Sequence, residues 1–227
     1  MEEIDMKTRI VSFATLLPLI LVVAGCATQP KPYESLASSS QLKPNPEGAA
    51  AYLYKAPNVD FKQYTKFIIP PVAIYQGPDA QFGSVSDEDK QEMADFIRSE
   101  FTKVLDQSYP IVTQSGPGVA QIKFTLAGLE TTNPVGATLT HLAPVGIVMN
   151  LGKTAGGGQG SFMGSVTFAG EIYDSQSNTL IAAFVSKQHA SAMDMTATLS
   201  ALDSAKAGVT EGAEKFKAAI DKIQKGQ

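Results

Sequence analysis

Few side chains in this sequence could converge to do chemistry. Its two histidines are His141 and His189, and a hydrolytic triad would need one of them beside Asp194 and a serine. No Gly-x-Ser-x-Gly segment marks such a serine. A metal site needs three or four ligands at compatible spacing, which this sequence does not offer. We therefore expect no catalytic residue, no metal site and no cofactor.

The remaining candidates for acid–base chemistry are carboxylates with simpler structural roles. Glu171 and Tyr173 alternate onto the polar face of an expected strand, and Asp174 opens a turn. Glu130, directly after another expected strand, is the third candidate. Strand alternation and turn formation account for these residues without catalysis.

The single cysteine lies where covalent lipidation is expected. Lys7 and Arg9 precede an apolar run over residues 10–23, and Gly25-Cys26 follows directly. Charge, apolar run and small residues in this order are typical of a secretory signal peptide. The run is shorter than the roughly 20 residues of a membrane-spanning helix. Val23-Ala24-Gly25-Cys26 resembles a bacterial lipobox, which predicts cleavage between Gly25 and Cys26 and acylation of Cys26.

Acyl chains on Cys26 would anchor the protein to a membrane, because each buried CH₂ contributes about 0.8 kcal/mol. Ala27, in place of an aspartate, favours the outer membrane of a Gram-negative bacterium, with the domain facing the periplasm. The inner membrane and the cell surface remain alternatives. A translation start at Met6 rather than Met1 also remains open.

Composition divides the chain into three parts. Residues 1–25 form the signal peptide, and residues 26–51 carry the lipidated cysteine and a flexible tether, since prolines and serines there replace large apolar side chains. Residues 52–227 form one periplasmic domain with an apolar insertion at 131–160. The net charge of −4 argues against nucleic-acid binding, and one cysteine excludes a disulfide framework.

Hydrophobic periodicity predicts an α+β fold with a single mixed or antiparallel sheet of about five strands and two main helices packed against it. The order is strand, helix, four strands, helix. Prolines 70 and 71 should interrupt the first strand at an edge or a bulge. The expected strands are 66–75, 109–113, 119–129, 162–173 and 180–187, and the expected helices are 87–106 and 199–223.

The segment 131–160 is apolar but follows neither helical nor strand periodicity. Such a long connection within a compact domain is often functional. It either covers one end of the sheet with its own side chains, or contacts an envelope protein, a second copy or the membrane. The predicted contact residues are Val135, Leu139, Leu142, Val145, Ile147, Val148, Met149 and Leu151.

Several short motifs resemble one known family. They are the segment 54–61, Pro70-Pro71-Val72, Gly116-Pro117-Gly118 and Tyr173-Asp174-Ser175. Together they resemble the uncharacterised bacterial lipoproteins catalogued as domain of unknown function 3313, over roughly residues 33–223. The resemblance implies export, lipidation and an α+β domain, and it supplies no activity or catalytic residues.

These observations favour a non-catalytic envelope lipoprotein that contacts another protein through residues 135–152. The alternative is a small-molecule or lipid-binding lipoprotein with a pocket between sheet and helices. An apolar pocket with a few polar groups would favour the alternative. A flat exposed apolar patch would favour the partner contact.

Deleting residues 139–152 tests the predicted contact. If they form an interface, we expect the variant to remain a folded monomer by gel filtration. In intact cells it should lose one envelope protein that the full lipoprotein captures by crosslinking. Unfolding of the variant would indicate a covering loop, and equal capture by both proteins would contradict the contact.

Overall fold

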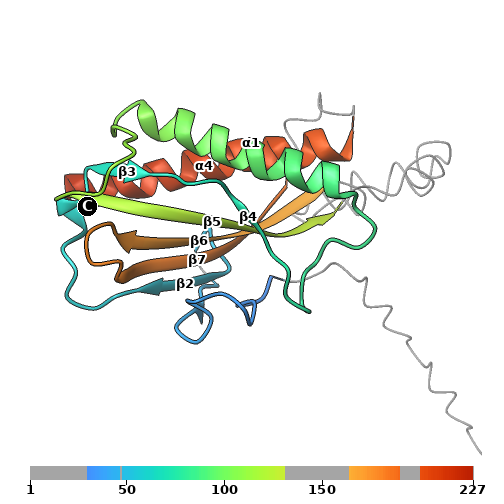
Figure 1. Ribbon diagram of the computed structural model, residues 1–227, viewed down its shortest axis with the longest axis horizontal. Helices are drawn as coiled ribbons and strands as arrows, with labels where there is room; N and C mark the ends of the chain where they lie inside the picture. The colour runs from blue at the N-terminus through green and yellow to red at the C-terminus, as the bar shows by residue number, and fades with distance from the viewer. Residues whose placement is uncertain (1–29, 47, 131–163, 190–199, 227) are drawn as a thin grey trace, which may run out of the picture.

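One mixed sheet with two long helices on one face forms the core of the protein. The computed structural model describes residues 30–46, 48–130, 164–189 and 200–226. Within them a seven-stranded sheet lies beneath the helices (Figure 1). The predicted α+β class is confirmed. In these ranges no helix combines the length and hydropathy needed to cross a membrane.

The sheet has the strand order β1-β2-β7-β6-β5-β3, with β4 also beside β5. The long strands β5, β6 and β7 are antiparallel, whereas β3 and β4 run parallel to β5. In chain order the elements are β1 (Lys43–Pro44), β2 (Tyr52–Lys55), the 3-10 turn η1 (Phe61–Gln63), β3 (Lys66–Ile68), β4 (Ala73–Ile74), α1 (Asp87–Asp106), β5 (Val119–Glu130), β6 (Ser165–Asp174), β7 (Leu180–His189) and α4 (Ala201–Lys225).

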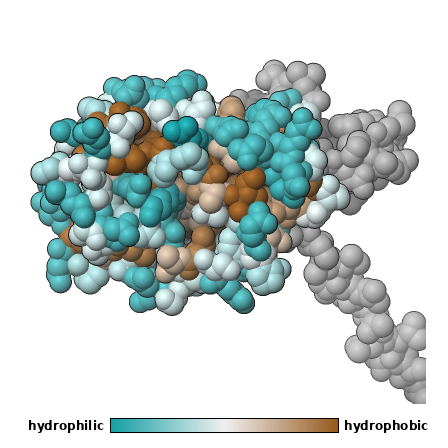
Figure 2. Space-filling view, in the orientation of Figure 1, coloured by the Kyte–Doolittle hydropathy of each residue, from teal (hydrophilic) through white to brown (hydrophobic). Residues whose placement is uncertain are grey.

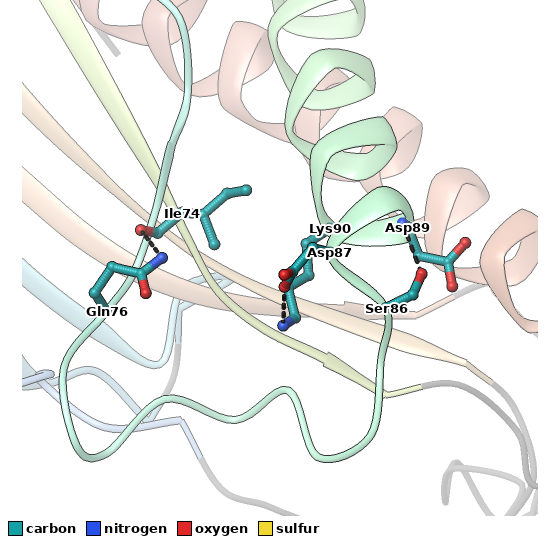
Figure 3. Close-up of polar contacts among 6 residues, drawn as sticks. All are labelled: Ile74, Gln76, Ser86, Asp87, Asp89 and Lys90. Carbon is teal, nitrogen blue, oxygen red and sulfur yellow. Dashed lines mark hydrogen bonds and ion pairs between the residues drawn. The ribbon is translucent and has the colours of Figure 1, made fainter.

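Helix α1 begins and ends where its sequence predicts. Ser86 Oγ accepts a hydrogen bond from the Asp89 backbone N–H at 3.1 Å, and Lys90 pairs with Asp87 at 2.9 Å (Figure 3). The cap satisfies one of the free N–H groups of the first turn, and the acidic residues there suit the positive end of the helix dipole.

The predicted strand over residues 66–75 forms two short strands, β3 and β4, interrupted at Pro70 and Pro71. This confirms the predicted interruption, since proline donates no ladder hydrogen bond. The predicted strand over 109–113 is reduced to one bridge between Ile111 and Phe67. No strand was predicted before residue 66, so β1 and β2 are additions to the expected sheet.

The main core lies between the helices and the sheet. Phe101 of α1 packs against Phe124 and Phe168, with ring centroids 4.3 and 5.6 Å away. The tilted and edge-on geometry of these rings is the favourable one for aromatic pairs. This aromatic cluster joins α1 to the middle strands β5 and β6.

The opposite face of the sheet is covered by residues 30–46, which we call the N-terminal segment. Tyr33, Leu36 and Leu42 are buried there, Tyr33 with only 1% of its surface exposed. They pack on a sheet face rich in alanine, including Ala127 and Ala169. The flexible tether predicted over residues 26–51 is therefore wrong for this segment, because three large apolar side chains suffice to dock it.

The N-terminal segment also buries the polar side chains that were expected to face solvent. Glu171 and Tyr173 are each 8% exposed. Glu171 Oε1 accepts a hydrogen bond from the Ser38 backbone N–H at 2.7 Å, and Tyr173 donates to its other oxygen at 3.3 Å. The predicted solvent-facing position of both residues is wrong, because period two identifies a face and not what covers it.

Replacing Leu36 by alanine tests this docking. We expect a loss of about 2–4 kcal/mol in the free energy of unfolding, because the variant leaves a cavity under the segment. Urea denaturation measures it, and Ser40→Ala, at an exposed neighbouring position, is the matched control. A Leu36→Ala effect as small as that of the control would mean that the segment does not contribute to folding.

Candidate functional site

The two helices cover only part of the sheet. Helix α1 packs against β4 and β5, and α4 packs against β5, β6 and β7. Within the described ranges neither helix packs against β1 or β2, and Figure 1 shows β2 at the edge of the sheet farther from both helices. The helix-side face of the sheet is therefore open beyond α4.

A pocket occupies this uncovered region, between α4 and the strands β2, β7 and β6. Its volume is about 270 Å³. We call it the α4 pocket. Its strand wall includes Leu53, Ala182 and Phe184, and its helix wall includes Phe216, Ala219, Ile220 and Ile223.

The wall of the α4 pocket is shaped by close contacts at two glycines. A Cβ on Gly170 would lie 2.4 Å from a ring carbon of Phe184, so the ring of Phe184 lies directly over this glycine. A Cβ on Gly212 of α4 would lie 3.2 Å from the Gln188 side chain. Glycine at these positions lets the ring and the helix approach the sheet closely.

The neutral polar side chains of the pocket are already engaged. The Asn45 amide donates to the Ala50 carbonyl at 3.0 Å, the Gln224 amide donates to the Tyr64 carbonyl at 3.1 Å, and the Gln188 amide donates to Ser186 Oγ. The other described lining residues are apolar except for Lys55, Lys215 and the hydroxyl groups of Tyr64 and Ser186. An apolar interior with a few polar groups is the common form of a small-ligand site.

A hydrogen bond from Tyr109, which follows α1, attaches the C-terminal half of α4 to the rest of the domain. Tyr109 donates to Asp221 at 2.5 Å, and Lys217 pairs with the other oxygen of Asp221 at 2.8 Å. These hydrogen bonds, first that from Lys217, lower the pKa of Asp221 below its usual value. Burial, and then the neighbouring carboxylate, raise the pKa of Tyr109 to about 12, so its hydroxyl remains a donor at neutral pH.

Among the described residues considered for catalysis, His189, Glu130 and Asp174 each have a separate structural environment. His189 is partly buried at the end of β7, and burial lowers its pKa. Glu130 accepts hydrogen bonds from Ser165 and Lys187, and Asp174 caps the β6–β7 turn by accepting from the Ser177 backbone at 2.7 Å. In the described parts of the chain no three His, Cys, Asp or Glu side chains form a group that could hold a metal.

Several predicted residues lie outside the described ranges and keep the status of predictions. They are Gly25, Cys26, His141, Asp194 and the contact residues between 135 and 151. The α4 pocket itself was anticipated only as an alternative. The small residues Ala182 and Ala219 are the sequence features that correspond to the pocket, but alanines are too common in strands and helices to identify a cavity.

Comparison with known proteins identifies the family. The description "Protein of unknown function (DUF3313)" matches residues 32–216, most of the chain. The chain belongs to this family. The resemblance inferred from the short motifs is thereby confirmed, and the match of the DUF3313 family extends over most of the N-terminal segment.

The relatives and solved structures that are similar to this DUF3313 chain do not indicate an activity for it. An "Uncharacterized lipoprotein YdcL" occurs in Escherichia coli K12 and in O157:H7. Each is 25% identical over 178 residues, covering 75% of this chain and 79% of the relative. The PelC dodecamer from Paraburkholderia phytofirmans has a TM-score of 0.38 at 9% identity, over 73% of this chain and 94% of that one. Protein XCC0632 from Xanthomonas campestris has a TM-score of 0.41 at 8% identity, over 76% and 92%.

Replacing Tyr109 by phenylalanine tests the attachment of α4. At neutral pH we expect the free energy of unfolding to fall by about 1–2 kcal/mol, because the variant loses a hydrogen bond to a charged group. Because the folded state lowers the pKa of Asp221, this stabilisation is complete above the usual pKa of an aspartate. It is lost as the pH falls through the lowered value. Urea denaturation from neutral to acidic pH should show the two proteins converging, and a difference that does not depend on pH would contradict the assignment.

Proposed function

We propose that this protein is a lipid-anchored envelope lipoprotein whose domain binds an apolar small molecule or lipid in the α4 pocket. The observation that supports this most directly is the pocket itself: about 270 Å³, lined mainly by aliphatic and aromatic side chains, with polar groups confined to a few positions. Small-ligand sites have this composition. The proposal includes no catalytic step.

The size of the α4 pocket limits the ligand. Its volume is slightly below the range of about 300–1,000 Å³ typical of drug-sized ligands. An engineered cavity of about 150 Å³ binds benzene. We therefore propose a single alkyl chain or a small ring system as the bound part, and not a whole two-chain phospholipid.

The proposed location follows from the lipobox and the relatives. Both E. coli relatives are named lipoproteins. Acylation of Cys26 would place the domain at a membrane, and Ala27 after the cysteine favours the outer membrane with the domain in the periplasm. A membrane location would also bring the pocket close to a source of apolar ligands.

Contact with an envelope partner through residues 135–152 remains a second proposal, and no described residue takes part in it. On the face drawn in Figure 2, apolar side chains form separate patches bordered by hydrophilic ones. This arrangement argues against a flat apolar docking surface on that face. A large contiguous apolar patch would be expected of a protein-binding face.

Two neighbouring alanines of α4 provide a matched test. Ala219 lines the pocket, whereas Ala218 does not, and both are exposed. We expect Ala219→Trp to obstruct the pocket and to weaken the binding of a fluorescent naphthylamine probe by about tenfold or more. That corresponds to about 1.4 kcal/mol. Ala218→Trp should bind the probe like the parent.

The measurement uses the chain from residue 26 onward with Cys26→Ser, which keeps every residue that the structure describes and needs no detergent. Native mass spectrometry of the full lipoprotein, with its signal peptide and Cys26 intact and purified from the bacterial envelope, should detect a bound apolar molecule. Failure of the parent protein to bind the probe would contradict the proposed function. If both tryptophan variants weakened the binding of the probe equally, the binding could not be assigned to the α4 pocket.

A further inference from the structure

Among the residues that the structure describes, the charged side chains of the α4 pocket all have the same sign. Lys55, at the end of β2, and Lys215, on α4, both line it, and no described aspartate or glutamate does. This is unexpected in a chain whose net charge is −4. The two lysines belong to different walls, one on the strand side and one on the helix side. They therefore approach any ligand from two elements.

Neither lysine is held by a strong interaction within the described part of the chain. Lys55 is exposed and forms no ion pair with any residue the structure describes. Lys215 pairs with Glu211 at 2.8 Å, but 49% and 39% of their side-chain surfaces are exposed. An exposed pair one helical turn apart contributes little to stability. Both ammonium groups can therefore turn toward a ligand without a large loss.

The other polar groups of the pocket do not compete for this role. The amides of Asn45, Gln188 and Gln224 each donate one hydrogen bond within the protein and carry no charge. Tyr64 donates to Asp174 at 3.1 Å, and burial raises the pKa of this tyrosine, so it stays neutral. Positive charge is thus the main feature that the pocket offers to a polar head group.

We propose that the ligand is a single-chain amphiphile with an anionic head group. Its alkyl chain lies among the apolar side chains of the α4 pocket, and its carboxylate or phosphate is bound by Lys55 and Lys215. Fatty acids and lysophospholipids share this chemistry. The inference rests on the proposed function and specifies the ligand class for the same site.

Ligands with one chain length and different head groups test the inference. Dodecanoate, dodecyl phosphate and dodecanol are titrated below their micelle concentrations, and displacement of the naphthylamine probe is followed. For the protein with intact lysines we expect both anions to bind about tenfold more tightly than the alcohol, which is the effect of one charge-assisted hydrogen bond. Added salt should reduce this preference, because the lysines are exposed.

Paired variants identify the lysines responsible. Lys55→Gln combined with Lys215→Gln should reduce the preference for anions to about twofold or less, and should leave the affinity for dodecanol unchanged. The matched control is Lys43→Gln combined with Lys222→Gln. It removes the same charge from β1 and α4 at exposed positions outside the pocket.

Each result has a distinct meaning. A preference for anions that the pocket pair removes and the control pair retains supports the inference, and the stronger of the two anions identifies a fatty acid or a phosphate ester. Equal affinity for the anions and dodecanol would overturn the inference while leaving the pocket as a binding site. A preference that persists without both lysines would overturn their assignment. Absence of binding by all three ligands would overturn the proposed function as well.

Discussion

The architecture depends on a mismatch between the width of the sheet and the width of the helical layer. Strands lie about 4.8 Å apart, so six neighbouring strands span about 29 Å. Two packed helices cover about 20 Å, since helices lie roughly 10 Å apart. Because α1 and α4 are placed over β4 to β7, the β2 end of the sheet is left without a helix over it. A pocket at this position is thus a direct result of the topology.

The single helical layer also explains why the sheet needs the N-terminal segment. The strands β5, β6 and β7 are buried along most of their length, and two helices can bury only one of their faces. The alanines of the other face leave shallow space, which Tyr33 and Leu36 fill. A buried carboxylate, Glu171, would be costly on this face without partners, and the Ser38 backbone and Tyr173 provide them.

The sequence predicts the helices and strands of this fold better than it predicts which residues cover the sheet. Periodicity and a capping box place α1 at its observed bounds, and alternation places the ends of β5, β6 and β7 within three residues. Hydrophobic periodicity did not predict β1, β2 or the docking of the N-terminal segment, because these elements are short and their apolar residues are widely spaced. Their burial depends on contacts with residues more than 100 positions away, such as that between Ser38 and Glu171.

For a related reason, the sequence predicts the α4 pocket only as the alternative to a partner contact. A pocket consists of the surfaces that elements fail to cover, and no local pattern records that failure. Lys55 and Lys215 are 160 residues apart in sequence and share a cavity only through the order of the strands. Sequence patterns predict no metal cluster and no catalytic motif, because those chemistries need particular residue types. They could not indicate an apolar cavity, whose residue types are those of any core.

Docking of the N-terminal segment sets the reach of the domain from its proposed anchor. A tether extending to residue 51 would allow excursions of up to about 90 Å, at about 3.5 Å per residue. Tyr33 is buried only seven positions after Cys26, so a fully extended chain between them spans no more than about 25 Å. This distance is comparable to the thickness of the domain's own layers. An acylated Cys26 would therefore keep the domain against the bilayer, with a restricted choice of the face it presents.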